Sequence, residues 1–467
     1  MFTIEEILRA TGGRLISGSI KTEIKGVSID SRTIYPGELF IAIKGERFDG
    51  HDFVEEALRR GAMGVVGATF MTPVFSGRMN PTPTSANPPF INVKDTTIAL
   101  GDIGSFNRKR FHIPVIGVTG SNGKTTTKEM VAHILSNRFN ILKNDGTQNN
   151  HIGLPQTLLR LNSTHGACVL EMGMNHSGEI ARLTRILKPT IGVITNIGAS
   201  HLEFLGTIEN VLMAKCELLE GIDAGGAAII NGGYPMLGKE VRKRFGGRVI
   251  TFGFDKGCDI MAEDVLSRDG WTIATINGAH KLRLNVPGRH NIENALASWA
   301  TASLLGLEEK LILNALSEFN LPPMRMELID VHGVRIINDS YNSNPLSAEC
   351  AIETLSDFEA KGRRIMVSGD MLELGDASAE AHRRLGILIA QSSIDMLMCV
   401  GNLSIKTADG AIAGGMEESR VRVCDGTRDA AKLLSETVKA GDVVLIKGSR
   451  RMKMEEIIGC FTTYYTH

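Results

Sequence analysis

The first part of the chain contains a short amphipathic helical pattern followed by short strand-like runs. Apolar positions at helical spacing (Ile4, Ile7 and Leu8) predict a helix at its start. Short apolar runs at 26–30 and 38–43 predict strands. Helix and strands together indicate a small α/β domain.

A helix and a loop are predicted next. The run 51–62 has a helical pattern, and Gly61 is placed to stop it. Residues 72–90 are rich in proline and small polar residues, which is typical of an exposed loop.

From about residue 113 the pattern changes to apolar runs separated by helical segments. This alternation is typical of a parallel α/β architecture with helices on both faces of the sheet. The predicted strands lie at 114–120, 167–173, 190–198 and 226–232, and the predicted helices at 128–139 and 291–306. A Pro-Pro pair within 320–328 indicates a linker. A second α/β pattern follows, with strands predicted at 334–340, 364–370, 396–401 and 443–449.

These patterns predict an α/β protein of three domains. We expect a small α/β domain over 1–110, a central parallel-sheet domain over 111–321 and a doubly wound, Rossmann-like domain over 322–467. No internal repeat of fixed period interrupts this order.

Composition narrows the classes of partner. Hydrophobic residues make up 43% and charged residues 22% of the 467, and the formal net charge is -1. A nearly neutral chain has no diffuse basic surface, so nucleic acid is not an expected partner. Seven scattered cysteines without a CxxC pair indicate reduced thiols. No run approaches the ~18 apolar residues of a membrane span, and the acidic N-terminus does not resemble a signal peptide. We therefore expect a cytoplasmic protein.

The strongest local motif is a glycine-rich turn between a strand and a helix. It comprises Gly120, Ser121, Asn122, Gly123, Lys124, Thr125 and Thr126. Glycines let backbone N–H groups converge on a phosphate, and a helix N-terminus favours an anion. Lys124 would neutralise the β- and γ-phosphates, and the Thr125 hydroxyl would bind Mg²⁺. The common GxxxxGK[ST] pattern requires glycine at 118, where this chain has valine. The turn nevertheless predicts a site for ATP.

Two polar residues follow predicted strands. Glu171 ends one strand and His201 follows another. The carboxyl ends of strands are where open α/β sheets bind ligands. A solvated carboxylate and a helix-capping histidine are the structural alternatives.

The segments TGSNGKTTT (119–127) and DSYNSNP (339–345) resemble the Mur ligase family, whose folylpolyglutamate synthase relatives share the first of them. Further motifs match in order, so the resemblance covers essentially the whole chain. It implies an ATP- and Mg²⁺-dependent ligase that joins a carboxylate to an amine through an acyl phosphate. The DSYNSNP form and the absence of a DNPR-type segment favour D-alanyl-D-alanine as the amine over diaminopimelate.

The resemblance also assigns roles in the catalytic centre. It places Thr125, Glu171 and His201 on the magnesium-binding positions, and Lys124 on the phosphates. Lys215 falls on a lysine that is carbamylated in several Mur ligases, although an ordinary exposed helical lysine is the alternative. Asn291 falls beside the nucleotide base, where an N-cap role explains it equally well. Arg325 falls on the ATP phosphates, since planar donors suit that task.

Substrate-contacting positions are assigned in the same way. Asp339 would accept hydrogen bonds from ribose hydroxyls. The other expected contacts are Thr147, Asn149, Asn150, Asn342 and Asn344 in turns, and Lys447, Ser449 and Arg450 for the dipeptide carboxylate. Turn capping by Asn and loop charges in solvent are the alternatives.

The leading domain resembles the UDP-binding domain of these ligases over 26–62. Ser31 and Arg32 suit a diphosphate or uridine, and Lys44 and Asp49 lie in a turn-rich loop suited to the muramoyl side. Folylpolyglutamate synthase lacks such a domain.

The resemblance therefore implies that the chain, expected to act as a monomer, adds D-alanyl-D-alanine to UDP-N-acetylmuramoyl-tripeptide in peptidoglycan precursor synthesis. Another Mur ligase, a folylpolyglutamate synthase and a nucleotide-binding module without ligase activity are the rivals. The third residue of the acceptor peptide, diaminopimelate or lysine, is left open.

Overall fold

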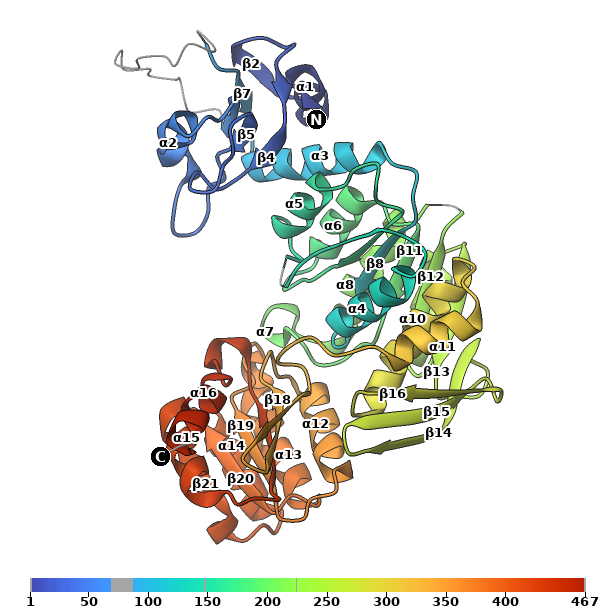
Figure 1. Ribbon diagram of the computed structural model, residues 1–467, viewed down its shortest axis with the longest axis vertical. Coiled ribbons are helices and arrows are strands. Elements are labelled where there is room, and N and C mark those ends of the chain that lie inside the picture. Colours follow the sequence, from blue (N-terminus) through green and yellow to red (C-terminus); the bar gives the residue numbers. More distant parts are fainter. Residues whose placement is uncertain (1, 69–86, 147, 224, 466–467) are drawn as a thin grey trace. The chain divides into compact units, whose positions relative to one another are not determined.

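The computed structural model describes residues 2–68, 87–146, 148–223 and 225–465 (Figure 1). These form two compact units, which are described separately. The first unit contains residues 1–115, 140–172 and 182–189, and the second contains 116–139, 173–181 and 190–467.

The first unit begins with a five-stranded sheet in the order β2-β7-β6-β5-β4. Its strands are β2 (Arg14–Ser17), β4 (Gly26–Ser28), β5 (Glu38–Ile41), β6 (Gly64–Ala68) and β7 (Phe90–Val93), and a separate pair joins β1 (Phe2–Thr3) to β3 (Glu23–Ile24). Strands β4 to β7 run parallel, and β2 pairs antiparallel with β7.

Helices α1 (Ile4–Thr11), α2 (Val54–Arg59) and α3 (Thr96–Lys109) accompany this sheet. Thr3 and Glu6 form a reciprocal capping box that fixes where α1 begins. Ile4 and Ile7 on α1 pack into one core with strand residues and with α3. The expected strand pattern of the leading domain is thereby confirmed, except that Phe90, predicted to close a loop, begins β7.

The first unit also holds the parallel strands β9 (Ile141–Lys143) and β10 (Ala167–Glu171), with α5 (Gly153–Leu159). All five residues of β10 are buried. A strand buried on both faces reads as a continuous apolar run, as the sequence does here.

The second unit contains a sheet region in the order β16-β15-β14-β13-β12-β11-β8. Its strands are β8 (Val115–Thr119), β11 (Ile191–Ile194), β12 (Ala227–Asn231), β13 (Arg248–Gly253), β14 (Ile260–Arg268), β15 (Trp271–Ile276) and β16 (His280–Leu284). Strands β8 and β11 to β14 are parallel, whereas β14, β15 and β16 form an antiparallel meander.

The helices of this region are α4 (Lys124–Leu135), α7 (Leu202–Leu205), α8 (Ile208–Cys216), α9 (Pro235–Arg244), α10 (Arg289–Leu304) and α11 (Glu309–Ser317), whereas most of α6 (Glu179–Leu187) belongs to the first unit. Helix α4 packs against α10 and α11. The parallel strands place the loops that follow β8 and β11 at one edge of the sheet.

The C-terminal region is a six-stranded sheet in the order β17-β18-β22-β19-β20-β21. Its strands are β17 (Glu327–Val331), β18 (Val334–Asp339), β19 (Arg364–Gly369), β20 (Met396–Val400), β21 (Val421–Cys424) and β22 (Val443–Lys447), and its helices are α12 (Pro345–Asp357), α13 (Ser378–Ala390), α14 (Ser404–Ala413), α15 (Thr427–Thr437) and α16 (Glu456–Tyr465). Only β17 runs antiparallel to its neighbour.

Successive side chains of these strands point to opposite faces. Ile337 packs beneath α12, α13 and α14, whereas its neighbour Ile336 packs beneath α15 and α16 (Figure 1). The expected doubly wound sheet is thus confirmed. The domain boundaries at 110 and 321 stay a prediction, because the two units are not defined by them.

Candidate phosphate-binding loop and its surroundings

The glycine-rich turn lies between β8 and α4, as its sequence predicts. Gly120 and Gly123 have φ angles of 149° and 77°, which side-chain-bearing residues rarely adopt. A Cβ on Gly120 would collide with the Thr195 hydroxyl, and one on Gly123 with the Asn294 amide oxygen. Both glycines are therefore required by close neighbours as well as by backbone conformation.

The loop is held by the segment that follows β11. The Ser121 hydroxyl donates to the Gly198 carbonyl at 3.0 Å and accepts from the Ser200 hydroxyl at 3.1 Å. The Asn122 N–H donates to the Asn196 side chain at 2.8 Å. These bonds fix the loop before any ligand binds, and they bring the neighbour of His201 to it.

Lys124 lies over the loop it terminates. Its ammonium donates to the carbonyls of Gly120 at 2.9 Å and Ser121 at 3.2 Å. The amine therefore lies above the turn, where a bound phosphate would be neutralised.

Arg325 reaches the first turn of α4 from the linker. Its guanidinium donates to the Thr125 hydroxyl at 2.8 Å and lies 3.9 Å from the centre of the Tyr341 ring. Met324 and Met326 on either side have φ angles of 60° and 52°. The linker is thus held in a strained conformation that directs one arginine at the loop.

Asn122 and Asn344 form a reciprocal pair of amide hydrogen bonds, at 3.1 and 2.7 Å. Asn344 also caps α12 by accepting from the Ser347 N–H at 2.9 Å. A residue expected to contact substrate therefore ties the C-terminal domain to the phosphate loop.

His201 also contacts the C-terminal domain. Its Nδ1 lies 2.8 Å from Oε2 of Glu373, and the two side chains are 18% and 35% exposed. The hydrogen bond with His201 lowers the pKa of the Glu373 carboxyl below its ordinary value, against the opposing effect of burial. Sequence reasoning did not single out Glu373.

Lys215 lies on α8 and is only 1% exposed. Among the residues that the structure describes, none forms an ion pair or a hydrogen bond with its amine. Burial, with a smaller contribution from Lys124, lowers the pKa of Lys215 well below its ordinary value. The alternative of an ordinary exposed helical lysine is therefore wrong.

In the first unit, Glu171 ends β10 and is 3% exposed. Its carboxylate accepts from the Asn149 amide at 2.7 Å, and Asn144 pairs with its backbone at 3.0 and 3.1 Å. Asn150 instead accepts from the N–H groups of Ile152 and Gly153. The capping alternative thus describes Asn150, whereas Asn149 positions the carboxylate. Thr147 lies outside the described residues.

Asp339 and Lys447 form a buried ion pair at 2.5 Å, and Lys447 also donates to the Asn342 carbonyl at 3.1 Å. Lys447 ends β22 and is 3% exposed, so the alternative of a loop charge in solvent is wrong for it. The neighbouring His290 is half-buried, and its partial desolvation lowers its pKa to about 4. Strand pairing brings Asp339 and Lys447 opposite each other.

Ser449 and Arg450 follow the same strand but differ in exposure. The Ser449 hydroxyl is buried and accepts from the Leu372 N–H at 2.8 Å. Arg450 is exposed and pairs with Glu455 at 2.6 Å. Ser449 therefore holds the loop containing Glu373, whereas Arg450 lies in solvent.

Asn291 is the third residue of α10 and is 2% exposed, because Gly288 occupies the N-cap position. The N-cap alternative is therefore wrong. Its amide donates to the Pro287 carbonyl at 2.7 Å and accepts from Asn294 at 3.0 Å. Asn294 in turn accepts from the Thr127 hydroxyl at 3.2 Å, so it links Asn291 to the helix that follows the loop.

In the leading domain, Ser31 is buried and donates to Glu56 at 3.1 Å. Arg32 is exposed and pairs with Asp30, and this hydrogen bond lowers the pKa of Asp30 to about 2. Asp49 begins a short 3-10 helix and lies 2.5 Å from the His51 ring, and Lys44 bridges to Asp49 through the backbone. Arg32 and Lys44 are thus the exposed cations of the set.

The described residues fit a nucleotide and a magnesium ion. The loop offers backbone N–H groups at the start of a 12-residue helix, with one lysine and one arginine beside it. Within the described ranges, no group of three or more His, Cys, Asp and Glu side chains could hold a metal. Magnesium bound through phosphates, waters and one or two protein ligands requires no such group.

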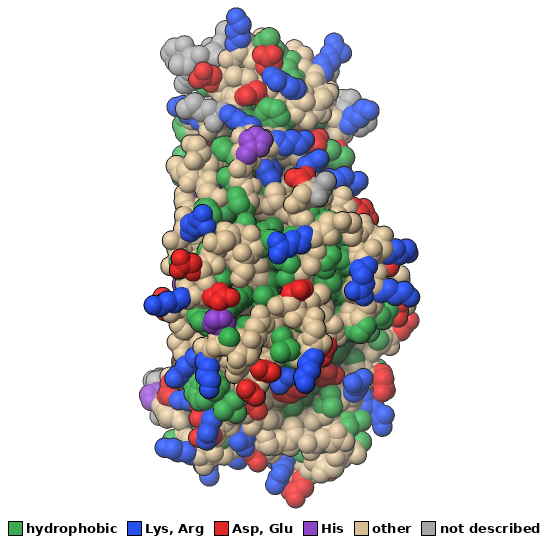
Figure 2. Space-filling model, turned by 90° about the vertical axis from the view of Figure 1, so that its right-hand side faces the viewer, with side chains coloured by type: hydrophobic (Ala, Val, Ile, Leu, Met, Phe, Trp, Pro, Cys, Tyr) green, Lys and Arg blue, Asp and Glu red, His purple; other side chains and the backbone are tan. Residues whose placement is uncertain are grey.

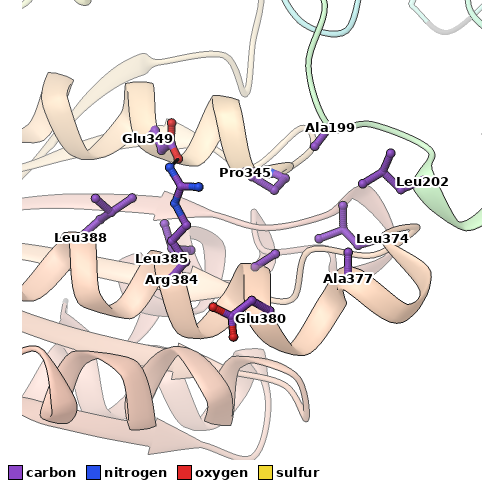
Figure 3. Close-up of a pocket in the computed structure, with 11 residues that line it drawn as sticks. Ala199, Leu202, Pro345, Glu349, Leu374, Ala377, Glu380, Arg384, Leu385 and Leu388 are labelled. Atoms are coloured by element: carbon purple, nitrogen blue, oxygen red, sulfur yellow. Dashed lines mark ion pairs between the residues drawn. The ribbon is translucent and has the colours of Figure 1, made fainter. Parts of the chain in front are cut away.

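An apolar pocket of about 230 Å³ is lined in part by residues that adjoin His201 and Glu373 in the sequence (Figure 3). Leu202 and Leu374, their neighbours in sequence, line it together with Leu385 of α13. Glu349 and Arg384 also line the pocket and form an ion pair at 3.6 Å.

Charged side chains of both signs are interspersed on the face shown in Figure 2. The chain has 51 Lys and Arg against 52 Asp and Glu, so local devices rather than net charge must attract an anion. In the described part of the chain, no helix combines the length and apolarity that crossing a bilayer requires.

Three family models match the chain in order. They are the Mur ligase family catalytic domain at residues 23–108, the Mur ligase middle domain at 118–302 and the Mur ligase glutamate ligase domain at 324–450. The middle-domain match contains the phosphate loop, Glu171, His201 and Lys215.

Curated relatives match over nearly the whole chain. A UDP-N-acetylmuramoyl-tripeptide–D-alanyl-D-alanine ligase from Bacillus subtilis is 37% identical over 98% of this chain and 97% of its own length. The ligase of the same name from Escherichia coli is 33% identical, with the same coverage.

Solved structures agree in fold. The crystal structure of MurF from Acinetobacter baumannii has a TM-score of 0.88 at 29% identity and covers 99% of both chains. MurF ligase from Thermotoga maritima, solved in complex with ADP, has a TM-score of 0.83 at 29% identity over 95% of this chain and 98% of its own. With the family models and the relatives, these similarities show that the chain belongs to the Mur ligase family.

Proposed function

We propose that this chain is the ligase that adds D-alanyl-D-alanine to UDP-N-acetylmuramoyl-tripeptide, with ATP and Mg²⁺, in peptidoglycan precursor synthesis. The observation that carries this is the 37% identity to a ligase of that name over 98% of the chain. The preformed phosphate loop agrees with it, because a glycine turn with a lysine at a helix N-terminus is a triphosphate site.

ATP supplies the energy by converting the terminal carboxylate of the tripeptide into an acyl phosphate, which an amine can attack. The residues of the chain contribute by position and charge, which dominate catalysis of phosphoryl transfer. Loop N–H groups from Gly120 to Thr126 hold phosphate oxygens, and Lys124 neutralises them. Arg325 provides planar donors for the same phosphates. Asn291 and Asp339 are proposed to contact the base and the ribose.

Thr125, Glu171 and His201 are each proposed as magnesium ligands, since hydroxyl, carboxylate and imidazole groups suit a divalent cation. The metal screens the negative charges that gather when a carboxylate approaches a triphosphate.

Lys215 is proposed to be carbamylated. A buried lysine with a lowered pKa has a neutral amine, and a neutral amine attacks carbon dioxide to give a carbamate with loss of one proton. Bicarbonate labelled with ¹³C should give a carbamate resonance in the wild-type protein that Lys215→Met lacks. The absence of this resonance from the wild-type spectrum would show that Lys215 is not carbamylated.

The remaining expected positions stay proposals for the two substrates. Ser31, Arg32, Lys44 and Asp49 are assigned to the UDP-muramoyl end, and Thr147, Asn149, Asn150, Asn342, Asn344, Lys447, Ser449 and Arg450 to the peptide and dipeptide. We assign the UDP substrate to domain 1–110, ATP to 111–321 and the dipeptide to 322–467, in a cytoplasmic monomer. Sedimentation equilibrium tests the monomer.

Phosphate release by the purified chain tests the reaction. With UDP-N-acetylmuramoyl-tripeptide, D-alanyl-D-alanine should give release that glutamate and diaminopimelate do not. Lys124→Ala should lower the rate by roughly 10²- to 10³-fold, as loss of a transition-state charge contact does. Lys109→Ala is the matched control, because Lys109 is an exposed lysine at the end of α3 and has no assigned role.

Two results would overturn the proposal. Turnover with glutamate or diaminopimelate in preference to the dipeptide would indicate another ligase of this family. ATP binding without turnover on any UDP-peptide would indicate a nucleotide-binding module.

A further inference from the structure

The hydrogen bond between His201 and Glu373 joins two residues with unusual backbone conformations. Their φ angles are 54° and 66°, in the left-handed region that residues other than glycine rarely adopt. Such a conformation is unfavourable and persists where the surroundings impose it, often at functional sites. Both ends of this contact are therefore held in place by the fold.

The backbones around the pair also approach closely. The Glu203 N–H donates to the Glu373 carbonyl at 3.1 Å. A Cβ on Gly375, where φ is 56°, would lie 3.1 Å from the Glu203 Cα. The side-chain contact is thus one part of a joint between the segments 201–203 and 373–375.

Apolar side chains continue this joint on one side. Leu202 and Leu374 line the pocket shown in Figure 3, together with α12 and α13. The Ser449 hydroxyl holds the same C-terminal loop at Leu372. The carboxylate of Glu373 is consequently presented by a loop with its own supports.

The chemical effect of the contact lies in the imidazole tautomer. A carboxylate beside Nδ1 requires the proton to be on Nδ1, which leaves the Nε2 lone pair as the free acceptor. Metal-binding histidines in proteins are commonly oriented in this way by a carboxylate on their other nitrogen.

We propose that Glu373 is a positioning residue that fixes the tautomer and orientation of His201, so that Nε2 is ready to bind the magnesium ion. This rests on the proposed function, which assigns the metal to His201. Glu373 belongs to the C-terminal domain and His201 to the central one. The tautomer and orientation of the His201 ring are therefore fixed only while the two segments are in contact.

The first test needs neither metal nor substrate. Selective ¹⁵N-histidine labelling of the full chain, with His201→Gln to assign the resonance, reports which ring nitrogen carries the proton. At pH 8.5 the wild type should show one tautomer with Nδ1 protonated. Glu373→Ala should shift His201 towards the Nε2-protonated form. Glu373→Gln should retain the wild-type tautomer, because its amide carbonyl still accepts.

The second test measures the metal. Mn²⁺ binding in the presence of ADP, followed by electron paramagnetic resonance, should weaken about 10-fold or more in Glu373→Ala, as loss of such a partner does. Glu373→Gln should retain most of the affinity. Asp376→Ala removes an exposed carboxylate three residues away and should change neither readout.

An unchanged His201 tautomer in Glu373→Ala would overturn the proposal, as would an equal effect of Asp376→Ala. A changed tautomer with unchanged Mn²⁺ affinity would also overturn it, because Glu373 would then orient the ring without serving the metal. These outcomes do not depend on turnover, so a chain without ligase activity would fail the proposed function and leave this test intact.

Discussion

Two buried lysines of this chain have very different surroundings. Lys215 on α8 and Lys447 at the end of β22 are exposed by only 1% and 3%. Lys447 faces Asp339 at 2.5 Å, whereas the charge that contributes to the lowered pKa of Lys215 is another cation, Lys124.

The difference separates a lysine that is paired with a carboxylate from one whose pKa burial lowers. An ion pair keeps a buried ammonium charged, because the carboxylate replaces the lost hydration. Burial beside a second cation favours the neutral amine, which is a nucleophile. The surroundings rather than the residue type determine the role.

The largest expected effect on stability comes from breaking the ion pair between Asp339 and Lys447. Lys447→Met leaves the Asp339 carboxylate buried without its partner and should lower the free energy of unfolding by about 3–5 kcal/mol. Urea denaturation measures this. Lys447→Met combined with Asp339→Leu should recover most of the loss. A cost below about 1 kcal/mol for the single variant would show that the pair does not hold this strand end.

The second effect concerns His290, which lies beside that pair. Its pKa is about 4 in the folded chain, against the ordinary histidine value of 6.5 in the unfolded chain. As the pH falls through 6.5, the unfolded chain takes up a proton that the folded one does not, so stability declines until about pH 4. At about 1.4 kcal/mol per unit of pH the total loss is roughly 3 kcal/mol.

His290→Gln should flatten this part of the stability profile, measured by urea denaturation between pH 4 and pH 7. His112→Gln, an exposed histidine, should leave the profile unchanged. Equal profiles for the wild type and His290→Gln would mean that the ring is charged in the folded chain.

A third and smaller effect should have the opposite sign. Lys215→Met removes a buried amine without a hydrogen bond and should raise the free energy of unfolding at pH 7 by about 1–3 kcal/mol. Because the folded pKa is lowered, the unfolded chain binds more protons, and wild-type stability rises with pH. The advantage of the variant should therefore shrink towards pH 10. An advantage that is constant with pH would contradict a neutral Lys215.

The smallest expected effect comes from an exposed ion pair, which serves as the comparison for the buried one. Lys406 and Asp409 form an exposed ion pair at 3.0 Å on α14. Lys406→Met should change the free energy of unfolding by about 0.5 kcal/mol or less, because solvent already screens the pair. A loss comparable to that of Lys447→Met would show that burial is not what separates the lysines.

Much of the fold follows from local pattern. The strands at 114–120 and 167–173 were predictable because buried parallel strands are continuous apolar runs. The loop at 120–126 was predictable because its two glycines, lysine and threonine have a local chemical reason to be adjacent. A helix over 128–139 was predicted. Helix α4 begins earlier, at Lys124, so the lysine of the loop is also the first residue of the helix.

Other features required contacts distant in sequence. Glu373 lies 172 residues from His201, and Asn344 lies 222 residues from Asn122. No spacing rule connects such positions. A helical pattern likewise could not place Asn291 inside α10 rather than at its cap, because Gly288 begins the helix without a side-chain cap.

The sequence by itself determined the alternation of strands and helices, the position of the phosphate loop and the family resemblance, because these depend on neighbours within a few residues. Only the tertiary structure decided which charges are paired, which carboxylate meets His201 and which lysine has a lowered pKa. Burial and distance set those properties, and both arise when segments far apart in the chain come together.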